Sequence, residues 1–237
     1  MSVRRSAVAF RFLTECSFIH MIVSEPSVRS ESVSSTDSTV SENAKAVSRA
    51  RIVDAARALF AERGYAACRV ADVARRAGMS AGNVYWHFDS KEALLAAILA
   101  EGFGSVETMT AEVAAAYGPA RRKLDLLLER TLALYDQNAL FMVILGGLMG
   151  HGGQELVRSL GFDMPEIGGR YHANLRRVFA EARSEGAVAP ADPDQLVTYY
   201  FAFFNGLLIT YGDQWPAMPR DALRDAALRL VGYRPAG

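Results

Sequence analysis

Apolar side chains recur every three or four residues along most of the chain, the spacing that places them on one face of an α-helix. A clear example is the stripe that includes Ile52, Leu59 and Phe60. It predicts a first helix over residues 46–63, with Gly64 as its stop. Similar stripes predict helices over residues 70–77, 80–88, 91–116, 120–136, 139–149, 167–185, 192–211 and 220–231. We therefore expect an all-α protein.

The second and third predicted helices are short and are separated by a tight turn. Gly78 can adopt a left-handed backbone without a Cβ penalty, so it ends the second helix. Ser80 can cap the third by accepting a hydrogen bond from the amide of Gly82 or Asn83. Val84 and Phe88 of this third helix face inward, so its outer surface is small, polar and aromatic. Such a helix, held at an angle by a glycine turn, fits the major groove of DNA.

Three segments carry a resemblance to a known family. They are RIVDAARALFAERGYAA (residues 51–67), VADVARRAGMSAGNVYWHF (70–88) and SKEALLAAIL (90–99). In these segments the chain resembles the DNA-binding region of the TetR family of bacterial transcriptional regulators. The resemblance implies an N-terminal three-helix helix-turn-helix DNA-binding domain and a C-terminal helical ligand-binding and dimerisation domain. We assign residues 46–106 to the first, residues 107–237 to the second and residues 1–45 to a disordered tail.

The resemblance also implies which residues meet DNA. Tyr85, His87 and Lys91 correspond to phosphate contacts, whereas Ala81, Gly82, Asn83 and Trp86 lie near base edges. Asn83 is the candidate for reading adenine through a bidentate pair. The nine candidate DNA contacts are Arg69, Ser80, Ala81, Gly82, Asn83, Tyr85, Trp86, His87 and Lys91.

The chain departs from the family pattern at the start of the second helix. Family members usually have two threonines there, the second of which caps the helix; here the pair is Cys68 and Arg69, while Asp72 remains at the partner position. Loss of the cap is expected to cost about 1 kcal/mol. Arg69 is either a substitute phosphate ligand or a surface charge, and Arg49 and Arg51 in the first helix present the same alternatives. Cys68 is interpreted as a small packing residue rather than a redox trigger.

Charge is balanced overall but not along the chain. The formal net charge is zero, with 26 basic and 26 acidic residues. Residues 48–91 contain 8 basic and 4 acidic residues, whereas residues 92–237 contain 13 and 17. A local basic excess on an acidic body is the distribution expected of a phosphate-facing domain, although an excess this small also arises by chance.

The N-terminal residues carry no chemistry that we can assign. Residues 24–44 are rich in Ser, Thr and acids and cannot bury enough apolar surface to fold alone. Residues 1–23 lack a signal-peptide cleavage site, and Met21 is an alternative first residue. Two cysteines without metal-ligand spacing fit a reducing bacterial cytoplasm. Without an uninterrupted apolar run of about 18 residues, no membrane span is expected.

The predicted helix over residues 192–211 is apolar on all sides, so it needs cover on every face. A second subunit is the simplest cover in a domain of this size. Together with the last helix, it resembles the pair with which the family forms a four-helix dimer bundle. We therefore expect a homodimer.

The inward faces of the C-terminal helices suggest a pocket for an apolar or aromatic effector, though most of these residues also fit an ordinary core. Asn205 lies among phenylalanines and leucines, so it either pairs with a neighbour across the dimer seam or orients a ligand. The nine candidate ligand contacts are Phe103, Met109, Tyr135, Phe141, Met142, Met149, Tyr171, Phe201 and Asn205.

We interpret the chain as a homodimeric repressor that a small molecule releases from a near-palindromic DNA operator, with the helix beginning at Lys91 as the transmission element. Two alternatives stay open: an activator or effector-independent regulator on the same scaffold, and a helical binding protein or enzyme that has lost DNA binding. No catalytic, metal or cofactor site is expected, because the four histidines lack ligand spacing and no nucleophile lies in a recognisable turn. The run GGLMGHGG (residues 146–153) lacks a preceding strand and a following lysine, so we interpret it as a helix end and a loop rather than a phosphate cradle.

Overall fold

The computed structural model describes residues 35–150, 152–211 and 214–234. These residues form helices joined by loops and contain no strand, which confirms the all-α prediction. The elements are α1 (Ser35–Arg63), α2 (Val70–Ala77), α3 (Ala81–His87), α4 (Lys91–Ala115), α5 (Ala120–Leu148), α6 (Gly153–Ser159), α7 (Met164–Ser184), α8 (Pro193–Tyr211), the 3-10 turn η1 (Trp215–Ala217) and α9 (Arg220–Leu230).

The first helix is longer than predicted. It begins at Ser35, whereas the sequence pattern placed its start at residue 46 and assigned residues 35–45 to a disordered tail. Extending an existing helix avoids the cost of nucleation, so polar residues join its end without any apolar face to bury. Residues 41–47 are indeed exposed to solvent. The remainder of the predicted tail, residues 1–34, lies outside the described residues.

The chain divides into two compact units, residues 1–47 and 48–237, and every site discussed below lies in the second. That unit contains two clusters of buried apolar side chains. The first joins α1, α2, α3 and the start of α4, and continues to Phe141 and Ile144 of α5. The second occupies the C-terminal helices. Helix α4 contributes Phe103 to the first cluster and Val113 to the second, so the domain boundary proposed at residues 106–107 falls inside a continuous helix.

Three C-terminal elements differ from the predicted ranges. The segments predicted over residues 120–136 and 139–149 form one helix, α5, with a kink at Asn138 (φ −115°, ψ 19°). The loop expected after the glycine-rich run contains a short helix, α6. Helix α7 begins at Met164 rather than at residue 167, because Pro165 occupies its first turn, where the missing N–H costs nothing.

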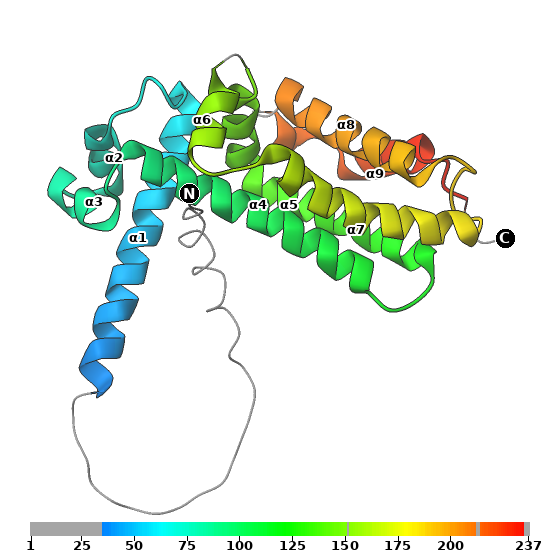
Figure 1. Cartoon of the computed structure of the whole chain (residues 1–237), viewed down its shortest axis with the longest axis horizontal. Coiled ribbons are helices and arrows are strands. Elements are labelled where there is room, and N and C mark those ends of the chain that lie inside the picture. Colours follow the sequence, from blue (N-terminus) through cyan, green and yellow to red (C-terminus); the bar gives the residue numbers. More distant parts are fainter. Residues whose placement is uncertain (1–34, 151, 212–213, 235–237) are drawn as a thin grey trace, which may run out of the picture. The chain divides into compact units, whose positions relative to one another are not determined.

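Helices α4, α5 and α7 pack against one another, and α8 packs on α5 and α7 (Figure 1). By length and composition alone, α4 and α5 would also pass as membrane-spanning helices. Both contribute buried residues to the apolar clusters, which accounts for their composition. The C-terminal helices together enclose the cavity described below.

Candidate DNA-binding surface and ligand pocket

The turn between α2 and α3 has the geometry that the sequence predicted. Gly78 adopts a left-handed conformation (φ 65°, ψ 37°) as the C-cap of α2. The N–H groups of Gly78 and Met79 donate to carbonyls of the last turn of α2, at 3.2 and 2.9 Å. Arg51 of α1 donates a third hydrogen bond, from Nη2 to the carbonyl oxygen of Ala77, at 2.8 Å. The end of α2 is therefore fixed both locally and by α1.

The start of α3 is capped by Ser80, as predicted. Its Oγ accepts a hydrogen bond from the N–H of Asn83 at 3.2 Å. Val84 is fully buried and Phe88 is 5% exposed, so these two side chains hold the helix on the first apolar cluster. Because a seven-residue helix is marginal alone, this anchoring is what maintains α3.

The outer face of α3 is open to solvent. Trp86 is 64% exposed and Tyr85 is 53% exposed, and Gly82 and Asn83 are exposed as well. Ala81 and His87 are half-buried, and the His87 ring packs edge-on against Trp86 with ring centroids 4.6 Å apart. Of the candidate base contacts, Gly82, Asn83 and Trp86 are thus accessible to a partner.

Lys91 occupies a different environment from the other candidate contacts. Its ammonium donates to the carbonyl oxygens of Tyr65 and Cys68, each at 3.0 Å, and lies 4.1 Å from the centroid of the Tyr65 ring. The Tyr65 hydroxyl in turn donates to the Glu92 carboxylate at 3.0 Å. The first turn of α4 is therefore tied to the loop between α1 and α2, and a phosphate contact by Lys91 stays a prediction.

The arginines of the helix-turn-helix region have distinct surroundings. Arg69 is exposed at the N-cap of α2, and its guanidinium has no acceptor with which to cap the helix. The backbone N–H of Arg69 donates to the carboxylate of Asp72 at 3.2 Å, so one of the two hydrogen bonds of a capping box is present. Arg49 lies 4.9 Å from the centroid of the Phe88 ring and 3.8 Å from the Glu101 carboxylate.

Cys68 is a packing residue. It is 2% exposed, and its thiol donates to the carbonyl oxygen of Leu59 at 3.3 Å. Burial raises the pKa of the thiol, and the nearby charges of Arg63 and Lys91 oppose that rise without cancelling it. A buried thiol that stays protonated does not act as a redox trigger. The other cysteine, Cys16, lies outside the described residues.

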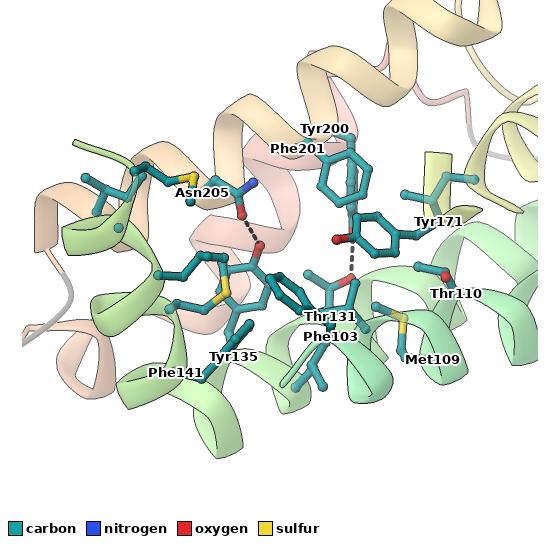
Figure 2. A pocket seen from close by; sticks show the side chains of 18 of the residues that line it. Phe103, Met109, Thr110, Thr131, Tyr135, Phe141, Tyr171, Tyr200, Phe201 and Asn205 are labelled. Carbon is teal, nitrogen blue, oxygen red and sulfur yellow. Dashed lines mark hydrogen bonds between the residues drawn. The ribbon is translucent and has the colours of Figure 1, made fainter. Parts of the chain in front are cut away.

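A cavity of about 230 Å³ lies between α4, α5, α7 and α8 (Figure 2). All nine side chains that the sequence suggested as ligand contacts line it. Two predicted contacts, Phe103 and Phe141, meet edge to face with ring centroids 5.4 Å apart. The ring centroids of Tyr171 and Phe201 lie 6.0 Å apart. The structure brings the predicted set together; that it binds a ligand stays a prediction.

The cavity has further lining residues that the sequence did not single out. They are Val106, Thr110, Thr131, Leu134, Leu145, Gly146, Met164, Leu175, Tyr200 and Ile209. Thr110, Thr131 and Tyr200 are polar residues on inward helix faces, and this pattern could have identified them from the sequence as residues of a polar cavity wall. The Tyr200 hydroxyl donates to Thr131 Oγ1 at 2.5 Å, and Thr110 Oγ1 accepts from Asn174 at 3.3 Å.

The polar groups of the cavity are neutral. Burial raises the pKa values of the Tyr135 and Tyr200 hydroxyls far above their usual range and that of Tyr171 to about 12. Asn205 pairs within its own chain, since its Oδ1 accepts the Tyr135 hydroxyl at 2.6 Å (Figure 2). The His172 ring lies 3.7 Å from the Asp194 carboxylate and does not line the cavity, and His151 lies outside the described residues.

The exposed face of α8 is unusually apolar. Tyr199, Ile209 and Tyr211 are 44%, 66% and 42% exposed. Gly206 lies on the same helix, and a Cβ added there would meet no atom of the chain within 4 Å. This is the surface that the sequence assigned to a dimer partner.

Comparison of sequences identifies a matching family and individual relatives of this chain. Residues 52–98 match the family model described as "Bacterial regulatory proteins, tetR family". The chain is 45% identical over 51 residues to the HTH-type transcriptional regulator TtgR of Pseudomonas putida, which is 22% of this chain and 24% of that protein. It is 30% identical over 105 residues to the HTH-type transcriptional repressor KstR of Mycolicibacterium smegmatis, 44% of this chain and 52% of that one. The chain thus spans about a quarter to a half of the length of these curated relatives, whose names describe regulators rather than enzymes.

Similarity to solved structures extends further along the chain. The crystal structure of FadR from Bacillus subtilis in complex with stearoyl-CoA aligns with 77% of this chain and 96% of that chain, with a TM-score of 0.60 and 23% identity. At this identity the match establishes the fold: a helix-turn-helix domain followed by a helical domain.

Proposed function

Because residues 52–98 make this chain a member of the TetR family, we propose that it is a homodimeric, DNA-binding transcriptional repressor released by a small molecule. The observation that carries the DNA-binding part is the division of α3 into two faces. Val84 and Phe88 are buried, whereas Asn83, Tyr85 and Trp86 are exposed to solvent around the rest of the helix. A short helix anchored from below and polar and aromatic above is suited to the major groove.

Two copies are needed for a palindromic operator. Recognition helices of a dimer enter successive major grooves about 34–36 Å apart. The exposed aromatic and aliphatic side chains of α8 favour a partner helix on this face, and Gly206 allows it to approach closely. The site of action would be the bacterial cytoplasm, where the DNA is.

The cavity is the proposed effector site, and α4 is the proposed connection to the DNA-binding region. Phe141 packs directly on Gly102 of α4: a Cβ added to Gly102 would lie 2.3 Å from the Phe141 ring. Phe141 also lines the cavity, three residues after the kink at Asn138. A ligand that moves Phe141 therefore acts on α4, whose first turn is tied to the helix-turn-helix loop through Lys91. It would shift the protein away from the DNA-bound conformer only as far as it binds the other conformer more tightly.

Direct DNA binding tests the first part. The purified protein is mixed with fluorescently labelled DNA from upstream of its own gene, and anisotropy is measured at increasing salt. We expect specific binding whose affinity falls steeply with salt, because phosphate contacts release counterions. Tyr85→Ala should weaken it at least tenfold, whereas the matched control Tyr117→Ala, which replaces a tyrosine 98% exposed at the end of α4, should not. Binding unaffected by Tyr85→Ala would contradict the assignment of α3.

Sedimentation velocity tests the dimer. Gly206→Arg places a long cation on the exposed face of α8, at a position where an added Cβ meets no atom of its own chain within 4 Å, so it should convert a dimer into a monomer. Gly169→Arg on α7, which also meets no atom within 4 Å, serves as the control. A wild-type protein that sediments as a monomer at micromolar concentration would exclude the proposed mode of operator binding.

A further inference from the structure

The cavity is lined without any charged side chain. Among its described lining residues there is no Asp, Glu, Lys, Arg or His. Its polar groups are hydroxyls and one amide, and Tyr135, Tyr171 and Tyr200 keep their protons because burial raises their pKa values. A carboxylate or phosphate placed here would lose its hydration and gain no counter-charge, which is strongly unfavourable.

Arg170, a cation beside the cavity, is already paired with two carboxylates. Arg170 lies near Tyr171, but its guanidinium pairs with Glu107 at 3.0 Å and Glu166 at 3.1 Å. Two carboxylates facing one guanidinium leave this side of the cavity with an excess of negative charge. An anionic ligand head group is therefore disfavoured beside Tyr171 as well as inside.

Two groups of the cavity wall can donate a hydrogen bond to a ligand: the Asn205 amide and the Tyr171 hydroxyl. The Asn205 carbonyl oxygen is occupied by the Tyr135 hydroxyl at 2.6 Å, which fixes the amide and turns its N–H₂ group the other way. The Tyr171 side chain extends from α7 and also lines the cavity (Figure 2). Both groups complement a ligand oxygen that accepts hydrogen bonds.

The size and wall chemistry restrict the ligand further. An apolar cavity of about 150 Å³ holds one benzene molecule, and this cavity of about 230 Å³ is moderately larger. Aromatic rings line it from α4, α5, α7 and α8, and methionines such as Met109 and Met142 adapt to the shape of a guest.

We infer that the cavity binds an uncharged aromatic molecule of one or two rings that carries a hydrogen-bond acceptor, with the acceptor held by the Asn205 amide. This inference rests on the proposed function only in taking the cavity as the effector site. It excludes ionised carboxylic acids and acyl-CoA thioesters as ligands of this cavity.

The chain contains its own reporter for a test. Trp215 is fully buried and lies 5.5 Å from the Tyr135 ring by centroid distance, whereas the only other tryptophan is Trp86 on α3. In a Trp86→Phe background, tryptophan emission therefore reports the cavity without DNA. The ligands titrated are acetophenone (neutral, with an acceptor), ethylbenzene (neutral, without one), benzoate (similar in size, anionic) and stearoyl-CoA.

Acetophenone is expected to bind, and benzoate and stearoyl-CoA to bind at least tenfold more weakly at pH 7. Asn205→Leu should weaken acetophenone binding about five- to tenfold, the worth of a neutral hydrogen bond, and leave ethylbenzene binding unchanged. Asn43→Leu, at an exposed position of α1, is the matched control and should change neither. Circular dichroism checks that each variant is folded.

Benzoate or stearoyl-CoA binding as tightly as acetophenone, or binding of none of the ligands, would overturn the inference. Should Asn205→Leu fail to fold, the comparison of acetophenone with benzoate on the unsubstituted cavity still decides it. Neither result depends on DNA, so failure here is distinguishable from failure of the proposed regulator, which is judged by operator binding alone.

Discussion

The helix-turn-helix region and the proposed effector cavity differ in how far apart in the sequence their hydrogen-bonded partners lie. Around α2 and α3 most polar contacts are local: Ser80 caps its own helix, and Asp72 receives the N–H of Arg69 three residues earlier. In the cavity, Tyr200 meets Thr131 across 69 residues and Tyr135 meets Asn205 across 70. The first region presents a preformed outer surface, whereas the second depends on how four helices pack. The proposed DNA-binding surface thus combines local caps with the burial of Val84 and Phe88, whereas these two polar contacts of the cavity join different helices.

The largest expected effect lies where the two regions join, at Phe141 and Gly102. Phe141→Ala should lower the free energy of unfolding by about 3–5 kcal/mol, because a buried aromatic ring leaves a cavity. Gly102→Ala should destabilise by about 1–3 kcal/mol, since the added Cβ overlaps the ring. Urea denaturation measures both.

The double variant sharpens this prediction. Once Phe141 is alanine, the Gly102→Ala change has room and should be neutral or stabilising by up to about 1 kcal/mol, the helix propensity gain of Ala over Gly. Additive effects of the two substitutions would show that the ring does not rest on Gly102, and α4 would lose its contact with the effector site.

Lys91→Met gives the next largest effect and separates two roles of this residue. Its ammonium bonds two loop carbonyls, so its loss should cost about 1.5–3 kcal/mol of unfolding free energy, the range for hydrogen bonds to a charged group. A residue that only contacts phosphate would leave stability unchanged and lower the salt dependence of DNA binding. Parallel denaturation and anisotropy measurements distinguish the outcomes, with Arg177→Met at an exposed position of α7 as the control.

Helix capping yields smaller changes of opposite sign. Ser80→Ala removes the cap of α3 and should destabilise by about 1 kcal/mol, whereas Arg69→Thr supplies the missing cap of α2 and should stabilise by about the same amount. If Arg69 is also a phosphate ligand, Arg69→Thr will reduce the slope of log affinity against log salt by about 0.9. An unchanged slope would identify it as a surface charge.

The smallest effect is a pH dependence at Asp72. A hydrogen bond from Arg75 and the N–H of Arg69 lower the pKa of its carboxyl below the usual value. Because the folded pKa is the lower one, this interaction stabilises the protein above the ordinary aspartate pKa and is lost as pH falls through the folded value. The stability difference between the wild type and Asp72→Asn should therefore shrink from pH 6 to pH 3. A difference that stays constant over this range would show that the carboxylate charge contributes nothing.

Some predictions depended on short-range chemistry, and these agree with the structure. The stop at Gly78 and the cap at Ser80 follow from residue type and spacing. The break expected between residues 136 and 139 appears as the kink at Asn138, where the backbone leaves helical geometry inside α5. The start of α1 at Ser35 and the presence of α6 were missed, since neither carries an apolar stripe long enough to detect.

The sequence by itself determined the helical pattern, the anchored face of α3 and the set of inward apolar residues, because each depends on a period of 3.6 residues along one helix. It could not show that Lys91 bonds loop carbonyls, that Asn205 meets Tyr135, or that Phe141 rests on Gly102. Those contacts join residues 23 to 70 positions apart, so they exist only once the helices have packed. The absence of charged side chains among the described residues that line the cavity belongs to the same class, since these residues come from four helices that lie far apart in the sequence.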